Sequence, residues 1–140
     1  FYINIFCFFF IAILPILGKE NTDRRHAETI WEETLSGQIS ESAPWRNQYS
    51  RIIVFDQSGE IIYWFIAEPE KTPEDLGKYL EKWQSRVLNG KNIFTVTKDQ
   101  FRNNLLYFWL TSGTAIRTNG SMQGAVFLIQ DIQILYSYIS

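Results

Sequence analysis

Apolar residues concentrate at both ends of the chain, and a mixed segment rich in aromatic residues lies between them. The first apolar run covers residues 1–17, where Asn4 is the one plainly polar residue. Its length is at the short limit of the roughly 17–25 residues that span hydrocarbon. A second run begins at Ile132. We predict a transmembrane segment over residues 1–18, an extracytoplasmic domain over 19–131 and the start of a second transmembrane helix over 132–140, with both ends continuing in a longer protein.

A cleaved secretory signal is the alternative explanation of the first run. The sequence Ile16-Leu17-Gly18 matches the small-residue cleavage pattern poorly, which favours an anchor. Lys19, Arg24 and Arg25 follow the run on the side taken as outside, against the usual cytoplasmic excess of basic residues. Both interpretations export the middle of the chain, so we expect the folded domain on the extracytoplasmic side of the cell membrane.

The domain is predicted to begin with a long helix. Asn21 or Thr22 can cap this helix, which is expected to end near Gln38. Because it follows the apolar run almost directly, the two segments can form one continuous rod. Apolar residues recur at the spacing of one helical face: Ala27, Ile30, Trp31 and Leu35.

A β-hairpin is predicted next, with strands over residues 51–55 and 61–66. Asp56 can accept backbone N–H bonds in the turn, and Gly59 can adopt the positive φ that closes it. Apolar residues occupy consecutive positions in both strands, which indicates strands covered on both faces.

The second half of the chain predicts another helix and three strands. Thr72 and Pro73 are typical of a helix start, and Asn89-Gly90 of its end. Strands are expected over residues 93–96, 105–111 and 124–129, with Gly113 and residues 118–121 in the turns. An apolar helix should follow. We therefore predict an α+β fold, in which a central antiparallel sheet of about five strands carries a long N-terminal helix and a second helix.

Charge and reactive side chains exclude several functions. The net charge of −2 is spread along the chain, so no nucleic-acid partner is expected. Cys7 has no second cysteine with which to form an internal disulfide. His26 is the one histidine and has no neighbouring ligand set, so we expect a solvated or capping role rather than metal binding. We therefore expect no catalytic residues, metal or cofactor in this segment.

Three sequence features together resemble a known family. They are the strand–turn–strand Ile53-Val54-Phe55-Asp56-Gln57-Ser58-Gly59-Glu60-Ile61-Ile62, the helix end Leu88-Asn89-Gly90-Lys91 and the final strand Gly124-Ala125-Val126-Phe127-Leu128. With the long first helix, they resemble the PAS-like (Cache) extracytoplasmic sensor domains of bacterial two-component histidine kinases. The resemblance implies a stimulus, either a small molecule or a protein, that acts on one side of the sheet. Output would pass through paired transmembrane helices to a cytoplasmic kinase.

The candidate ligand-binding residues follow from the alternation of side chains in the strand over 105–111. Tyr107, Trp109 and Thr111 share one face, where aromatic surface and polar groups suit a pocket wall. Arg102 and Arg117 are added because a guanidinium can bind an anionic ligand such as a carboxylate, although a solvated surface charge is the simpler role for each.

Other functions remain open at this stage. The segment could be the sensor region of a chemoreceptor or a diguanylate cyclase, or a membrane-anchored module that binds proteins through some of its five tryptophans. Sensor kinases dimerise through their N-terminal helix, so we also expect a homodimer. Its candidate contacts are Ile30, Trp31 and Leu35.

Overall fold

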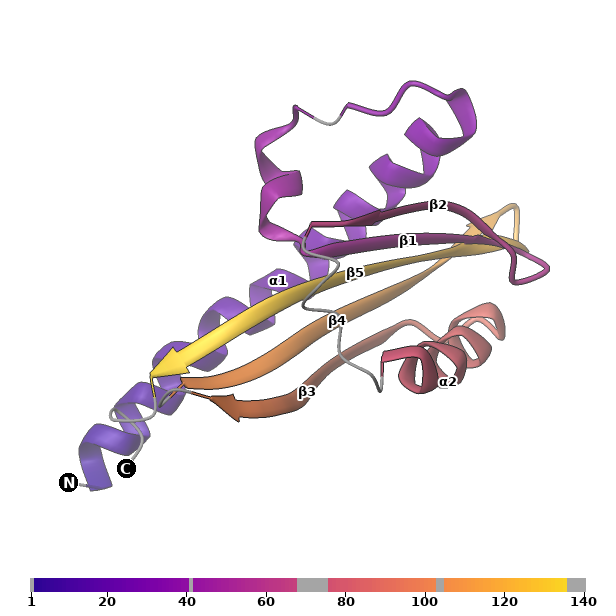
Figure 1. Cartoon of the computed structure of the whole chain (residues 1–140). Helices are drawn as coiled ribbons and strands as arrows, with labels where there is room; N and C mark the ends of the chain where they lie inside the picture. Colours follow the sequence, from indigo (N-terminus) through magenta and orange to yellow (C-terminus); the bar gives the residue numbers. More distant parts are fainter. Residues whose placement is uncertain (1, 41, 68–75, 103–104, 136–140) are drawn as a thin grey trace.

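The computed structural model describes residues 2–40, 42–67, 76–102 and 105–135, with side chains described for 18–40, 42–67, 76–97 and 108–132. Within these residues the chain forms two α-helices, one short 3-10 helix and five strands (Figure 1). Their order is α1 (Tyr2–Ser36), η1 (Pro44–Gln48), β1 (Arg51–Asp56), β2 (Ile61–Ile66), α2 (Leu76–Leu88), β3 (Ile93–Arg102), β4 (Leu105–Thr118) and β5 (Ser121–Leu135). The α+β prediction is confirmed.

The five strands form one antiparallel sheet in the order β2-β1-β5-β4-β3. β1 pairs with both β2 and β5, so the last strand of the chain lies at the centre of the sheet. A tight turn joins β4 to β5, with positive φ at Asn119 and Gly120 (53° and 78°). Such angles suit the type I′ turn that matches the twist of a hairpin. The central antiparallel sheet of five strands, with a long N-terminal helix and a second helix, agrees with the arrangement predicted from the sequence.

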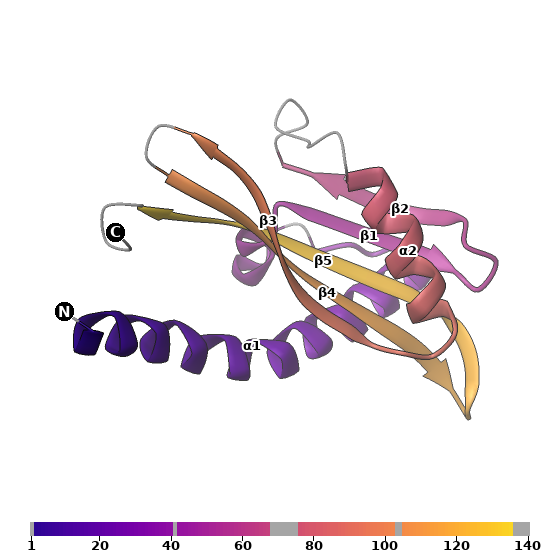
Figure 2. The same ribbon diagram turned by 90° about the horizontal axis from the view of Figure 1, so that it is seen from below.

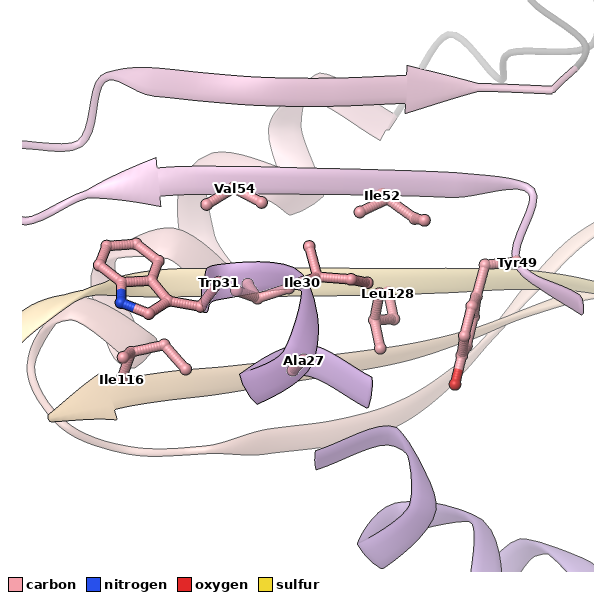
Figure 3. Packing of buried hydrophobic residues seen from close by; sticks show 9 residues of the cluster. Ala27, Ile30, Trp31, Tyr49, Ile52, Val54, Ile116 and Leu128 are labelled. Carbon is pink, nitrogen blue, oxygen red and sulfur yellow. The ribbon is translucent and has the colours of Figure 1, made fainter. Parts of the chain in front are cut away.

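The two helices lie on opposite faces of the sheet (Figures 1 and 2). Because side chains alternate along a strand, β1 and β5 contribute to both cores. The core under α1, shown in Figure 3, contains Ala27, Ile30, Trp31, Tyr49, Ile52, Val54, Ile116, Val126 and Leu128. The core under α2 contains Ile53, Phe55, Leu76, Trp83, Val87, Trp109, Ala125, Phe127 and Ile129.

Helix α1 is continuous from Tyr2 to Ser36, which confirms the prediction of one rod. Asn21 and Thr22 are therefore interior residues and do not cap the helix. The Thr22 hydroxyl instead donates a hydrogen bond to the carbonyl of Gly18, one turn earlier (3.2 Å). The chain leaves the helix at Gly37, whose φ of 73° suits a glycine after the last turn.

The predicted Asp56 turn and the end of the second helix are confirmed. The Asp56 carboxylate accepts bonds from the backbone N–H groups of Ser58 and Glu60 (2.9 and 3.0 Å), and Gly59 has a φ of 89°. The hydrogen bond from the Ser58 hydroxyl is the main cause that lowers the pKa of Asp56. Helix α2 ends before Gly90, where φ is 95°. The predicted cap at Thr72 lies outside the described residues.

Strands β3, β4 and β5 are longer than predicted, and this corrects two expectations. Gly113 lies within β4 opposite Phe127, so it does not mark a turn. Residues 132–135 continue β5 and pair with β4, where the sequence had predicted the start of a transmembrane helix. The physical reason is the period of the pattern: apolar Ile132 and Ile134 alternate with Asp131 and Gln133, which suits a strand. Residues 136–140 lie outside the described residues.

The two strands of the first hairpin differ in burial, although both were expected to be covered. β1 is buried along almost its whole length, whereas β2 is mostly exposed at the edge of the sheet. β2 lies away from the main helix contacts, because α1 lies mainly over β4 and β5 and α2 lies mainly over β3 to β5. A search of the described residues finds no helix that is long and apolar enough to cross a membrane.

Candidate functional site

A row of polar side chains crosses the α2 face of the sheet. The strand register places Arg51 of β1, Ile129 of β5, Thr111 of β4 and Thr95 of β3 side by side. Both Arg51 and Thr111 are almost fully buried. We call Arg51, Thr95 and Thr111 the polar row. It lies beside the N-terminal end of α2, because the next cross-strand pair is Trp109 with Asp131, and Trp109 contacts Tyr79 of that helix.

The polar row holds a buried positive charge. The Arg51 guanidinium donates to the Asp131 carboxylate at 3.2 Å, and the side chain of Asp131 is only partly exposed. The Thr111 hydroxyl is fully buried, and within the described part of the chain it has no hydrogen-bond partner. An unsatisfied buried hydroxyl costs about 1–3 kcal/mol, so this group would gain from a polar atom placed beside it. The row therefore places a charged donor and a buried hydroxyl on the same face of the sheet as the Trp109 indole.

A second cluster of polar residues joins α1 to the sheet. Asp23 of α1 is 1 % exposed, and its carboxylate accepts hydrogen bonds from three side chains. Ser112 of β4 donates at 2.5 Å and Lys19 at 3.0 Å, and the Tyr49 hydroxyl donates to the same oxygen as Lys19. We call Lys19, Asp23, His26, Tyr49 and Ser112 the Asp23 cluster. It connects the first helix, the segment after η1 and a central strand.

His26 completes the Asp23 cluster from the helix surface. Its Nδ1 lies 2.7 Å from the Tyr49 hydroxyl, and its ring stacks on Trp45 at 4.2 Å between centroids. Because Tyr49 gives its one hydroxyl proton to Asp23, Nδ1 of His26 must carry a proton and donate it to the tyrosine oxygen. The expected solvated or capping role of His26 is therefore wrong: the ring is half-buried and bonded to the domain.

Burial changes the acidity of both rings in this cluster. It raises the pKa of Tyr49, and the hydrogen bond to Asp23 raises it further. Burial also lowers the pKa of His26, and the nearby positive charges of Lys19 and Arg25 add to that effect, while Asp23 opposes it. Tyr49 thus remains a neutral donor, and the folded domain favours neutral His26.

The structure brings together only some of the predicted ligand-binding residues. Trp109 and Thr111 lie on the α2 face, as the alternation predicted, but Arg117 lies farther along β4. Its guanidinium donates to the carbonyl of Gly90 at 2.7 Å and so binds the C-terminal end of α2. Tyr107 and Arg102 lie in β4 and β3, and their side chains are outside the described residues. Ligand contact remains a prediction for all five.

The expected dimer contacts on α1 are not equivalent. Ile30 and Trp31 are buried in the core under α1, as Figure 3 shows, and so offer little surface to a second helix. Leu35 is 65 % exposed. It lines a shallow groove of about 360 Å³ together with Trp31, Arg117 and the exposed glutamates Glu28 and Glu32. A helix dimer therefore depends on Leu35 and stays a prediction.

Sequence reasoning missed Arg51, Asp23 and Tyr49. One signal was available for Asp23: it precedes Ala27 by four residues and Ile30 by seven, so it shares their apolar helix face. A charged residue in such a stripe indicates a buried partner. The partners themselves are 26 and 89 residues away along the chain, so only the fold reveals them. Among residues with described side chains, no three potential metal ligands come together.

Comparisons with known proteins give low similarity. No family model matches the chain, and no curated protein matches it. The PAS domain of the histidine kinase ThkA matches with a TM-score of 0.40 and 16 % identity, over 57 % of this chain and 96 % of that one. The extracellular domain of vpHK1S-Z8, a protein assigned as a histidine kinase, matches with a TM-score of 0.43 and 19 % identity, over 91 % of this chain and 57 % of that one. This chain thus spans little more than half of the second domain.

Proposed function

We propose that this chain is the extracytoplasmic sensor region of a membrane-bound two-component histidine kinase. The observation that carries the proposal is the continuity of α1. Its first half is the apolar run over residues 2–17, and its second half is bonded to the sheet through the Asp23 cluster and the core under α1. A domain built in this way delivers any movement of its sheet directly to the segment that we assign to the membrane.

The stimulus must favour one arrangement of helix and sheet over another. A ligand that binds two arrangements equally shifts neither population, however tightly it binds. The Asp23 cluster provides the element whose arrangement can differ, because it joins α1 to β4 by a buried carboxylate. Breaking that contact leaves the carboxylate without its donors, so the bonded arrangement has a distinct free energy.

The stimulus itself is proposed to bind at the polar row. Arg51 and Thr111 offer a charged donor and a hydroxyl beside Trp109, which suits a small ligand with a carboxylate or similar polar group. Thr111 directly precedes Ser112 in β4, and the Ser112 hydroxyl donates a hydrogen bond to Asp23 of α1. A ligand that moves β4 at Thr111 would therefore move the bond that anchors α1. Tyr107 and Arg102 are kept as further candidate contacts.

The proposal can be tested by joining the 140-residue chain to the cytoplasmic region of a histidine kinase. Autophosphorylation would be measured in membrane vesicles for the wild type, for Asp23→Asn and for Glu20→Gln, an exposed change one turn earlier on α1. We expect Asp23→Asn to change basal phosphorylation at least about threefold, since its altered acceptor weakens the link between α1 and β4. Glu20→Gln should leave it unchanged. Equal phosphorylation in all three chimeras, each inserted and folded, would contradict the proposed coupling.

A further inference from the structure

The two edge strands of the sheet, β2 and β3, differ in charge. β2 is the terminal strand on one side and β3 on the other. The sequence of β2, Ile61–Ile66, contains no charged residue and no proline. β3 carries Lys98, Asp99 and Arg102, and its register shifts between Lys98 and Phe101. Charges and register irregularities are the usual devices that prevent edge strands from pairing with another chain. Both edge strands have a register irregularity, since the pairing of β1 with β2 shifts between Val54 and Phe55, but only β3 carries charged residues.

Large apolar side chains are exposed along β2. Ile61 is 55 % exposed, Ile62 41 %, Trp64 62 % and Phe65 39 %. Because large apolar side chains carry roughly 150–250 Å² each, these fractions correspond to about 400 Å² of apolar surface on one copy. The register places Ile61 and Trp64 on the α2 face of the sheet and Phe65 on the α1 face, so exposed apolar surface flanks the strand on both faces. Among the described strands, β2 pairs with β1 alone, so no described strand bonds to the backbone N–H and C=O groups on its outer side.

The structure points to one partner for this surface: we propose that two copies of the chain associate by antiparallel pairing of β2 with β2. A two-fold contact places a strand against itself in the opposite direction. Any charge within the strand would then approach the same charge on the other copy, and β2 contains none. Pairing would cover part of this apolar surface on both copies and satisfy the backbone groups of both edges.

This inference does not depend on the sensor assignment, but it changes the expected dimer. The sequence had placed the dimer contact on α1, at residues of which two are buried against the sheet. Pairing through β2 would instead join two sheets edge to edge, with the polar row and the Asp23 cluster of each copy outside the interface. The two models therefore make different predictions for substitutions on α1 and on β2.

The test measures the association state of the 140-residue chain in detergent by sedimentation over a range of concentrations. We expect the wild type to approach twice the monomer mass as its concentration rises. Trp64→Lys should weaken the dimer at least about tenfold, because it places like charges together across the two-fold axis. Val96→Lys is the matched control, since Val96 is an exposed apolar residue (49 %) on the opposite edge strand. Leu35→Lys tests the alternative contact on α1.

Disulfide trapping supplies a second measurement that does not require a destabilising charge. In a Cys7→Ser background, Trp64→Cys should form a covalent dimer on mild oxidation, because a residue at the two-fold axis of a self-paired strand meets its own copy within the distances that disulfides accept. Val96→Cys should remain monomeric. The proposal is overturned if the wild type stays monomeric or if only Leu35→Lys dissociates the dimer. It is also overturned if Trp64→Lys and Val96→Lys weaken the dimer equally, or if only Val96→Cys forms a covalent dimer. If Trp64→Lys fails to fold, the trapping result decides.

Discussion

The Asp23 cluster leads to a quantitative prediction about stability. Replacing Asp23 by alanine removes the acceptor shared by Tyr49, Ser112 and Lys19. The Ser112 hydroxyl is then left buried without that acceptor, at a cost of about 1–3 kcal/mol. The Tyr49 hydroxyl can turn to Nδ1 of His26, 2.7 Å away, if the imidazole changes tautomer, so its cost is smaller. Lys19 can reach water. We therefore expect a loss of about 2–4 kcal/mol, a large part of the 5–15 kcal/mol typical of a domain.

The loss should be measured by urea denaturation of the 140-residue chain in detergent, followed by tryptophan fluorescence. Glu20→Ala is the control, because its ion pair with Arg24 is exposed and long (3.6 Å), and such pairs contribute about 0–1 kcal/mol. A double-mutant cycle with Ser112→Ala should give a coupling energy of about 1–2 kcal/mol between positions 23 and 112. A loss no greater than that of Glu20→Ala, or a coupling within error of zero, would refute the assignment of Asp23 as the buried link between α1 and β4.

Three further predictions follow from other sites. Gly113→Ala should destabilise the domain by about 1–3 kcal/mol, because a Cβ there would lie 2.6 Å from the Phe127 ring; Gly77→Ala, where the Cβ meets nothing within 4 Å, should stabilise α2 by about 0.5–1 kcal/mol. Because the pKa of His26 is lowered in the folded domain, its contribution to stability is complete above pH 6.5 and is lost as the pH falls toward the folded-state pKa. The urea concentration at the midpoint of unfolding should therefore be lower at pH 5.5 than at pH 7.5, and this difference should be smaller in His26→Gln. Thr111→Val should leave stability unchanged or raise it by up to about 1 kcal/mol, because its hydroxyl has no described partner, yet abolish the thermal shift caused by any ligand of the polar row.

Each of these predictions has a result that would contradict it. Equal stability of the two glycine variants would mean that β4 moves away from Phe127 without cost. An identical pH dependence in His26→Gln would mean that the loss does not come from the imidazole. A ligand shift that survives Thr111→Val, in a folded variant, would place the ligand away from the polar row.

Local sequence chemistry predicted the short-range structure well. The Asp56 turn and the helix end at Gly90 depend on residues within a few positions of one another, and both have the predicted geometry. Gly113 was misread because a glycine in a strand and a glycine in a turn look alike in sequence. Its role depends on Phe127, Ile93 and Val87, which meet at its Cα only after folding.

The site could be predicted only in part. Period-two alternation placed Trp109 and Thr111 on one face correctly, because that face depends on the strand alone. Their neighbour Arg51 arrives from a strand 60 residues earlier in the chain, through the pairing of β1 with β5. The apolar face of α1 was also predicted correctly, but its pattern does not say whether the partner is a sheet or a second helix. Ile30 and Trp31 were predicted to contact the helix of another copy, but they pack against the sheet of their own domain.

The two anchors on α1 make the helix a lever arm. Asp23 binds Ser112, and the Trp31 ring lies so close to Gly124 that a Cβ there would approach it to 2.6 Å. Eight residues separate these anchors, or about 12 Å of helix, so the rod can neither turn nor slide on the sheet without losing one of them. The 21 residues from Asp23 back to Tyr2 project about 32 Å beyond the first anchor. A tilt of about 5° at the sheet would carry the far end of that arm through roughly 3 Å, so a rearrangement too small to alter the domain's own packing would be amplified at its tip.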